Sequence, residues 1–104
     1  MFDIEEFIEN GHSPFAEWFN GLDAVTAARI DRAIRRLEKG NFGAVETARE
    51  GVSELKLDFG PGYRVYYGIT GKTLVILLGG GSKKRQSKDI NAAVARWKRF
   101  KLGR

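Results

Sequence analysis

The sequence predicts an α+β fold: a single compact domain with a twisted antiparallel β-sheet, an N-terminal αα-hairpin and a C-terminal helix packed on the sheet. Three observations support this prediction. The chain has 104 residues, the size of one domain, so we treat residues 1–104 as one unit. Apolar residues recur at helical spacing near both ends of the chain. Between them lie runs rich in β-branched and aromatic residues, separated by glycine turns, which predict strands.

The N-terminal part predicts a short edge strand followed by two helices. Apolar residues are interspersed with acidic ones over Phe2–Ile8, which favours a strand at the edge of the sheet. The Ser13-Pro14 pair is a helix-start signal, because serine caps and proline fits the first helical position; this helix ends at Gly21. Asp23 caps a second helix that ends at Gly40. The short link between the helices predicts an antiparallel αα-hairpin.

Both helices are amphipathic. The first is expected to bury its aromatic residues, Phe15, Trp18 and Phe19. The second carries its apolar stripe at Ala27, Ile30, Ile34 and Leu37. Its other side is strongly basic, with Arg29, Arg32, Arg35 and Arg36. These stripes indicate that both helices pack on the sheet.

The second half of the chain predicts three strands and a last helix. The strands are Val52–Phe59, Tyr63–Ile69 and Thr73–Leu78, with turns at residues 60–62 and 70–72. Residues 41–51, which precede them, have no clear pattern and are treated as a connector. The last helix is expected from about Ser87 to Arg99, with Ile90, Ala93, Val94 and Trp97 as its apolar stripe.

Strand alternation places three polar side chains on one face of the predicted hairpin. Lys56, Arg64 and Tyr66 all lie opposite the apolar residues of their strands. A three-residue loop would pair Asp58 with Arg64, and Lys56 with Tyr66, on a face that the core leaves free. One interpretation is an anion site. The other is an exposed cross-strand ion pair, worth at most about 1 kcal/mol, and alternation alone does not choose between them.

The third strand is followed by a glycine-rich segment and then by basic residues, GGGSKKRQSKDI. We expect Gly79–Gly81 to form a loop whose N–H groups can approach a phosphate closely. The spacing differs from that of a nucleotide-binding loop, which excludes a nucleoside triphosphate site. It suits a nucleic-acid backbone, which is contacted mainly by Lys, Arg and N–H groups.

The charge distribution also indicates an anionic partner. Residues 1–23 carry six acidic residues and no lysine or arginine, whereas residues 82–104 carry nine basic residues and one acid. Such segregation favours nucleic acid or an acidic protein, although it also serves solubility. The chain has no cysteine and one histidine, so we expect no metal and no cofactor. No apolar run reaches membrane-spanning length, and we expect a cytoplasmic protein without membrane contact.

These residues resemble a known family. The runs GVSELKLDFGPGYRVYY and LLGGGSKKRQSKDI, together with the helix ending LEKGN, are similar in order and spacing to the phage-derived, HigB-like branch of the RelE/ParE toxins. Members of that branch are often described as addiction module killer proteins. The resemblance covers nearly the whole chain and implies the fold derived above.

The resemblance implies the toxin of a type II toxin–antitoxin system. RelE- and HigB-like members cleave mRNA on the ribosome without a metal. The implied partners are therefore mRNA, the ribosome and a cognate helix-turn-helix antitoxin, through which alone the toxin reaches operator DNA. ParE-like members instead inhibit DNA gyrase, and a catalytically inactive RNA-binding relative is a further alternative. A plain adaptor protein without toxicity also fits the charge asymmetry.

The resemblance also implies a set of site residues. Arg64 matches the arginine that contacts the scissile phosphate, Lys56 lies near the cationic strand residues, and Lys83 falls near the second phosphate-contacting cation. Tyr66 is the candidate proton donor. RNA binding is assigned to Lys84, Arg85, Gln86 and Lys88. One position departs from the pattern: Ile90 stands where several RNA-cleaving relatives carry a tyrosine or histidine.

Overall fold

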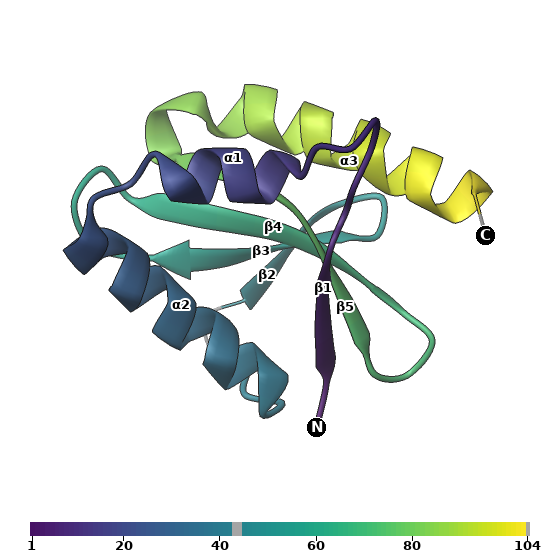
Figure 1. The fold of residues 1–104 in the computed structure, drawn as a ribbon, viewed down its shortest axis with the longest axis horizontal. Helices are drawn as coiled ribbons and strands as arrows, with labels where there is room; N and C mark the ends of the chain where they lie inside the picture. Colours follow the sequence, from purple (N-terminus) through teal and green to yellow (C-terminus); the bar gives the residue numbers. More distant parts are fainter. Residues whose placement is uncertain (43–44, 104) are drawn as a thin grey trace.

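A computed structural model describes residues 1–42 and 45–103 of the chain. Its five strands form one sheet in the order β1-β5-β4-β3-β2 (Figure 1). The strands are β1 (Asp3–Glu6), β2 (Val45–Arg49), β3 (Val52–Leu57), β4 (Tyr63–Thr70) and β5 (Leu74–Ser82). Neighbours in sequence from β2 to β5 pair antiparallel, while β1 pairs parallel with β5 at the edge. The α+β prediction is confirmed, with a sheet that is mixed through this one pair.

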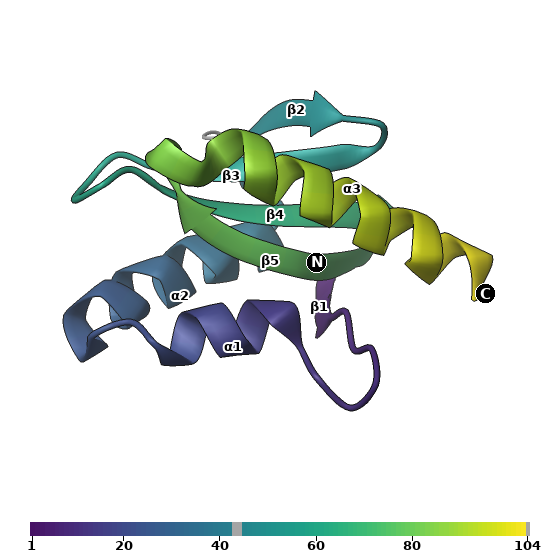
Figure 2. The same ribbon diagram turned by 90° about the horizontal axis from the view of Figure 1, so that it is seen from above.

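Helices cover both faces of the sheet. On one face lie α1 (Pro14–Asn20) and α2 (Ala24–Glu38). On the other lies α3 (Gln86–Leu102), which follows the short 3₁₀ turn η1 (Lys83–Arg85). Figure 2 shows the resulting three layers, with the sheet between α3 above and the α1–α2 pair below. No helix in the described ranges is both long enough and apolar enough to cross a membrane.

The predicted caps set the starts of the first two helices. The Ser13 side chain accepts a hydrogen bond from the Ala16 N–H at 3.0 Å. Asp23 does the same for the Thr26 N–H at 2.9 Å, and these bonds satisfy N–H groups that a helix start leaves without partners. Between the two helices the chain reverses direction, and both lie on one face of the sheet (Figures 1 and 2).

The connector of the sequence analysis contains an additional strand, β2. It pairs antiparallel with β3, with a bulge between Thr47 and Arg49. Residues 43 and 44 of that connector lie outside the described residues. The strand is short and its alternation of Val45, Glu46 and Thr47 covers too few residues to predict a strand from sequence.

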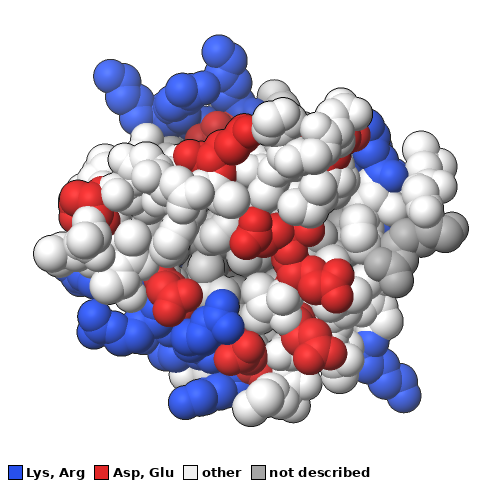
Figure 3. All heavy atoms as spheres, viewed as in Figure 1, with Lys and Arg blue, Asp and Glu red and all other residues white. Residues whose placement is uncertain are grey.

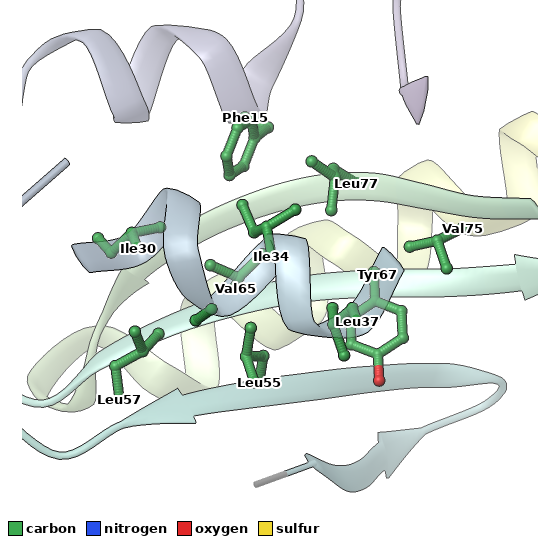
Figure 4. Packing of buried hydrophobic residues seen from close by; sticks show 11 residues of the cluster. Phe15, Ile30, Ile34, Leu37, Leu55, Leu57, Val65, Tyr67, Val75 and Leu77 are labelled. Atoms are coloured by element: carbon green, nitrogen blue, oxygen red, sulfur yellow. The ribbon is translucent and has the colours of Figure 1, made fainter. Parts of the chain in front are cut away.

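The largest core lies between the sheet and the α1–α2 pair. Figure 4 shows Ile30, Ile34 and Leu37 of α2 pointing at the strands, with Phe15 of α1 above Leu77. The remaining buried members of this cluster are Ala33, Leu55, Leu57, Val65, Tyr67 and Val75. A second cluster lies under α3 and consists of Phe7, Val52, Tyr66, Ile76, Leu78, Ala93, Val94 and Trp97.

The predicted hairpin register was wrong by two residues. Leu57 pairs with Tyr63 and Lys56 with Arg64, so Arg64 faces Lys56 and not Asp58. The reason is the turn: the Gly62 N–H donates to the Phe59 carbonyl at 3.0 Å, which uses Phe59 for the turn and ends strand pairing earlier. The assignment of residues to faces survives, because a shift of two residues preserves alternation.

The predicted glycine loop was also wrong. Gly79, Gly80 and Gly81 belong to β5 and pair with Tyr66, Val65 and Arg64 of β4. A Cβ on Gly80 would lie 2.3 Å from the Trp18 ring, and a Cβ on Gly81 would lie 1.9 Å from Asp89 Oδ2. Glycine is therefore required here because side chains from both helical layers rest directly on the strand. The strand is irregular at Leu78, where the register shifts by one residue.

Candidate nucleic-acid interface

Arg64 is the central predicted residue, and the structure buries it. It lies on β4, on the face covered by α3, with only 5% of its surface exposed. Its Nη1 donates to the Gly62 carbonyl at 3.0 Å and to the Tyr63 carbonyl at 3.3 Å. These bonds turn the guanidinium toward the hairpin loop. Its Nε is buried and has no hydrogen-bond partner in the described part of the chain.

Lys83 meets Arg64 at a hollow beside the hairpin loop. The hollow has a volume of about 350 Å³ and is lined by Asp58, the Phe59–Gly62 turn, Arg64 and Lys83. The Lys83 N–H donates to the Gly62 carbonyl at 2.8 Å, which ties the end of β5 to the loop. The structure thus brings the predicted Arg64 and Lys83 to one hollow, through a strand end and not through a glycine loop.

Lys56 lies directly across from Arg64, but its charge is engaged elsewhere. Its Nζ lies 2.8 Å from Glu46 Oε2 and 3.9 Å from Glu54 Oε1. Its side chain is 29% exposed. The lysine is therefore held on the sheet by two carboxylates, on the β2 side of Arg64.

Tyr66 does not lie on a free face, contrary to expectation. It is fully buried under α3, and its hydroxyl has no hydrogen-bond partner among the described residues. Burial raises its pKa far above the ordinary value, and the charges of Glu54 and Asp89 raise it further. Strand alternation predicted a free face because it does not reveal which helix covers the strand.

Two carboxylates near this face were not predicted. Glu54 is 3% exposed and accepts hydrogen bonds from Gln86 Nε2 at 3.1 Å to each of its oxygens. Asp89 lies over Gly81, with Oδ2 buried and without a hydrogen-bond partner in the described ranges. Burial raises the pKa of Asp89, and the nearby Arg85, Arg96 and Lys88 oppose that rise. Glu54 lies two residues before Lys56 in β3 and therefore on the same face of the sheet. Strand alternation could have identified it as a neighbour of the predicted site.

The predicted RNA-binding residues separate into two groups. Lys84 and Arg85 of η1 and Lys88 in the first turn of α3 are exposed. Gln86 is half-buried and bound to Glu54, so it acts in the structure as a tie between α3 and the sheet. Arg85 also lines a second hollow of about 240 Å³, together with Trp18, Tyr63 and Asp89. Ile90 packs against the core under α3.

The single histidine lies apart from this face. His12 pairs with Glu9 through backbone hydrogen bonds, and its Nδ1 lies 3.0 Å from Glu17 Oε2. No group of three or more histidine, aspartate or glutamate side chains in the described ranges is arranged to hold a metal ion. The arrangement is therefore one of cations around a polar strand: Arg64 and Lys83 face a hollow, with further basic side chains at the adjoining helix start.

Comparison with known proteins identifies the family. The family model described as "Phage derived protein Gp49-like (DUF891)" matches residues 17–98, which include both helical layers and β2–β5. An uncharacterized protein of Haemophilus influenzae is 45% identical over 80 residues, covering 76% of this chain and 81% of that protein. The residues that the family model matches contain Arg64, Lys83 and the whole predicted interface. The chain belongs to the Gp49-like family of phage-derived proteins.

Proposed function

We propose that this protein is the toxin of a type II toxin–antitoxin system and acts as a metal-independent endoribonuclease on ribosome-bound mRNA. The observation that carries the proposal is the hollow that Arg64 and Lys83 share. Two cations fixed around one cavity suit a phosphate, whose oxygens accept hydrogen bonds from both. Membership of a phage-derived family and the resemblance to HigB-like toxins support the same function.

The chemistry is attack of an RNA 2′-oxygen on the adjacent phosphate. In this reaction the 2′-hydroxyl loses a proton, the phosphate gathers negative charge and the 5′-oxygen leaves with a proton. Arg64 and Lys83 stabilise the gathering charge, and their positions are set in advance by backbone hydrogen bonds near Gly62. Lys84, Arg85 and Lys88 hold the flanking phosphates. Lys56, already paired with carboxylates, keeps Glu54 neutralised beside Arg64.

The partners follow from this function. The target is mRNA in the ribosome, so the toxin acts in the cytoplasm. A cognate helix-turn-helix antitoxin neutralises the toxin and connects it to operator DNA. No cofactor takes part in the proposed reaction.

Mapping of cut sites in induced cells tests the proposal. Expression of the wild-type chain is expected to stop growth and to produce cuts within reading frames, read by primer extension. Lys83→Ala should reduce cutting about a hundredfold, because it removes one group that stabilises the transition state. Lys72→Ala is the matched control, since Lys72 is exposed in the turn between β4 and β5. Arg64→Ala should have at least as large an effect, with circular dichroism to verify folding.

A second candidate function is inhibition of DNA gyrase without catalysis. It is favoured by the burial of Tyr66 and by Ile90, because neither supplies a proton donor at the hollow. Growth arrest with intact messages and double-strand DNA breaks would establish this alternative and refute the ribonuclease. Growth without any inhibition would refute both.

A further inference from the structure

A further hollow lies on the opposite side of the sheet from Arg64. It has a volume of about 670 Å³ and lies between β1, α1 and α2. Its floor is apolar and includes Phe15, Ile34 and Leu77, which belong to the main core. Figure 3 shows this face, with a hollow near its centre and acidic side chains along its right-hand side. We call it the β1 groove.

One wall of the β1 groove is an open strand edge. The N–H groups of Asp3 and Phe7 donate to the β5 side, to the Thr73 and Leu77 carbonyls at 2.7 and 2.9 Å. Backbone groups alternate along a strand, so the N–H groups of Ile4 and Glu6 point away from β5. An open edge of this kind is a template for another strand.

The groove is closed at one end and open at the other. The Phe2 N–H donates to the Glu38 carbonyl at the end of α2, at 2.7 Å. Like the N–H groups of Ile4 and Glu6, it points away from β5. Toward the other end lies Ile8, an apolar side chain that is 59% exposed. The four residues of β1 span about 13 Å at strand rise, so the edge accepts a segment of roughly four to six residues.

The rim of the groove is acidic. Glu5, Glu6 and Asp31 line it, and Arg35 is the one basic residue among its lining side chains. Arg35 is already engaged by Glu38 at 3.0 Å and by Asp31 at 3.6 Å. Within the described ranges, Glu5 and Glu6 have no ion-pair partner. Charge complementarity therefore selects a basic occupant.

We propose that the β1 groove is a docking site for an extended, basic and amphipathic segment of a partner polypeptide, which adds to the sheet as a further strand beside β1. Main-chain bonds to Ile4 and Glu6 hold the segment in place. Its apolar side chains pack on the half-buried Ile4 and Phe19 and on the exposed Ile8. Its lysine or arginine side chains meet Glu5 and Glu6. Since α3 and Arg64 lie across the sheet, docking here is independent of whether the chain cuts RNA.

A peptide titration tests the proposal. The probe is a short peptide of alternating lysine and valine, and the control peptide alternates glutamate and valine. The full chain, labelled with ¹⁵N, is titrated with each peptide, and amide exchange is followed by NMR. Binding of the lysine peptide should slow exchange at Ile4 and Glu6, and the glutamate peptide should have no such effect.

Two substitutions at Glu6 separate charge from strand addition. Glu6 is exposed, so neither change disturbs the core. Glu6→Gln removes the charge and should weaken binding about threefold. Glu6→Pro also removes the outward N–H, which β1 does not use for pairing with β5, and should weaken binding by about a further tenfold. Glu50→Gln, at the exposed turn between β2 and β3, is the matched control and should leave affinity unchanged.

Several results would overturn the proposal. Equal affinities of Glu6→Pro and Glu6→Gln would show that the peptide does not add as a strand. Equal binding of both peptides would remove the argument from charge. Exchange changes confined to α3 would place the lysine peptide on the other face. If the free chain sediments as a dimer that Glu6→Pro dissociates, a second copy is the occupant and the partner segment is excluded.

Discussion

The two faces of the sheet bury different chemistry. On the side of α1 and α2 the buried polar groups are the Tyr67 hydroxyl and two hydrogen-bonded residues at the helix starts, Ser13 and Thr26. Under α3 the same strands bury Glu54 and Arg64, together with the Tyr66 hydroxyl. All three buried side-chain atoms without a hydrogen-bond partner in the described residues, on Arg64, Tyr66 and Asp89, lie on the α3 side.

This difference separates a face that stabilises the fold from one that retains polar groups at a cost. A buried polar atom without a partner costs about 1–3 kcal/mol, so three such atoms are a burden for a domain of this size. The apolar face supplies the compensating stability. We therefore expect substitutions on the α1–α2 face to change stability most, and substitutions on the α3 face to change stability less or even to increase it.

The largest effect is expected from Leu37→Ala. Leu37 has no exposed surface and lies in the main core, so its truncation should lower the free energy of unfolding by about 2–5 kcal/mol. Urea unfolding measures this change. Val25→Ala, on the same helix but 73% exposed, is the control and should change stability by less than about 0.5 kcal/mol. A loss for Leu37→Ala no larger than that of the control would contradict the assignment of the main core.

A smaller loss of stability is expected from substitutions at two consecutive glycines of β5. Gly80 packs against α1 and Gly81 against α3. In Gly80→Ala the new Cβ would lie 2.3 Å from the rigid Trp18 ring, at a cost of about 1–3 kcal/mol. In Gly81→Ala the nearest atom is a carboxylate oxygen of Asp89, which can swing away. Thermal unfolding of both variants should therefore show the larger loss for Gly80→Ala. The reverse order would mean that Asp89 is fixed more firmly than Trp18.

The smallest effect, and the sharpest contrast, is expected from two adjacent tyrosines. Tyr66→Phe removes a hydroxyl without a partner and should raise the free energy of unfolding at neutral pH by about 1 kcal/mol. Tyr67→Phe, on the other face, loses a hydrogen bond with Ser53 and should lower it by about 1 kcal/mol. Changes of the same sign in urea unfolding would remove the distinction between the faces.

The pH dependence extends this test. Burial raises the pKa of Tyr66 above its ordinary value of 10.0, so in the folded state it keeps its proton at a pH where the unfolded chain loses it. Its contribution to stability is thus complete below pH 10 and declines as the pH rises above 10. Burial also raises the pKa of Tyr67, to about 12. A variant that lacks only one of the two tyrosines therefore still loses some stability as the pH rises above 10. Tyr66→Phe should lose less stability than the wild type between pH 10 and pH 12.

Local signals predicted most of the fold. The caps at Ser13 and Asp23 are contacts within four residues, and local sequence patterns identified the helices and four of the five strands, including the edge strand β1. The parallel pairing of β1 depends on a long-range contact that no local pattern encodes. The hairpin register depended on a single hydrogen bond between Phe59 and Gly62, which decides whether the loop has three or five residues.

The sequence predicted which candidate residues lie close together, but it did not predict how exposed their side chains are. Arg64 and Lys83 meet as the sequence suggested, because the meander brings a strand and the end of its neighbour together. The burial of Tyr66 and the ties from Gln86 to Glu54 depend on where α3 packs, and the sequence does not give that position. The glycines were misread for the same reason, since a glycine under a tryptophan and a glycine in a loop look identical in one sequence.

The irregularity at Leu78 determines the pairing register of the residues that follow it in β5. Because that one residue is extra, Gly81 lies opposite Arg64 and the chain leaves the sheet at Ser82, beside Gly62. With regular pairing after Tyr67 and Leu77, Gly80 would take the place of Gly81 opposite Arg64, and Lys83 would move one position along the strand, about 3.3 Å. The extra residue in β5 thus sets which glycine faces Arg64 and where Lys83 leaves the sheet. Chain length at β5 is as much a determinant of the site as the identity of its residues.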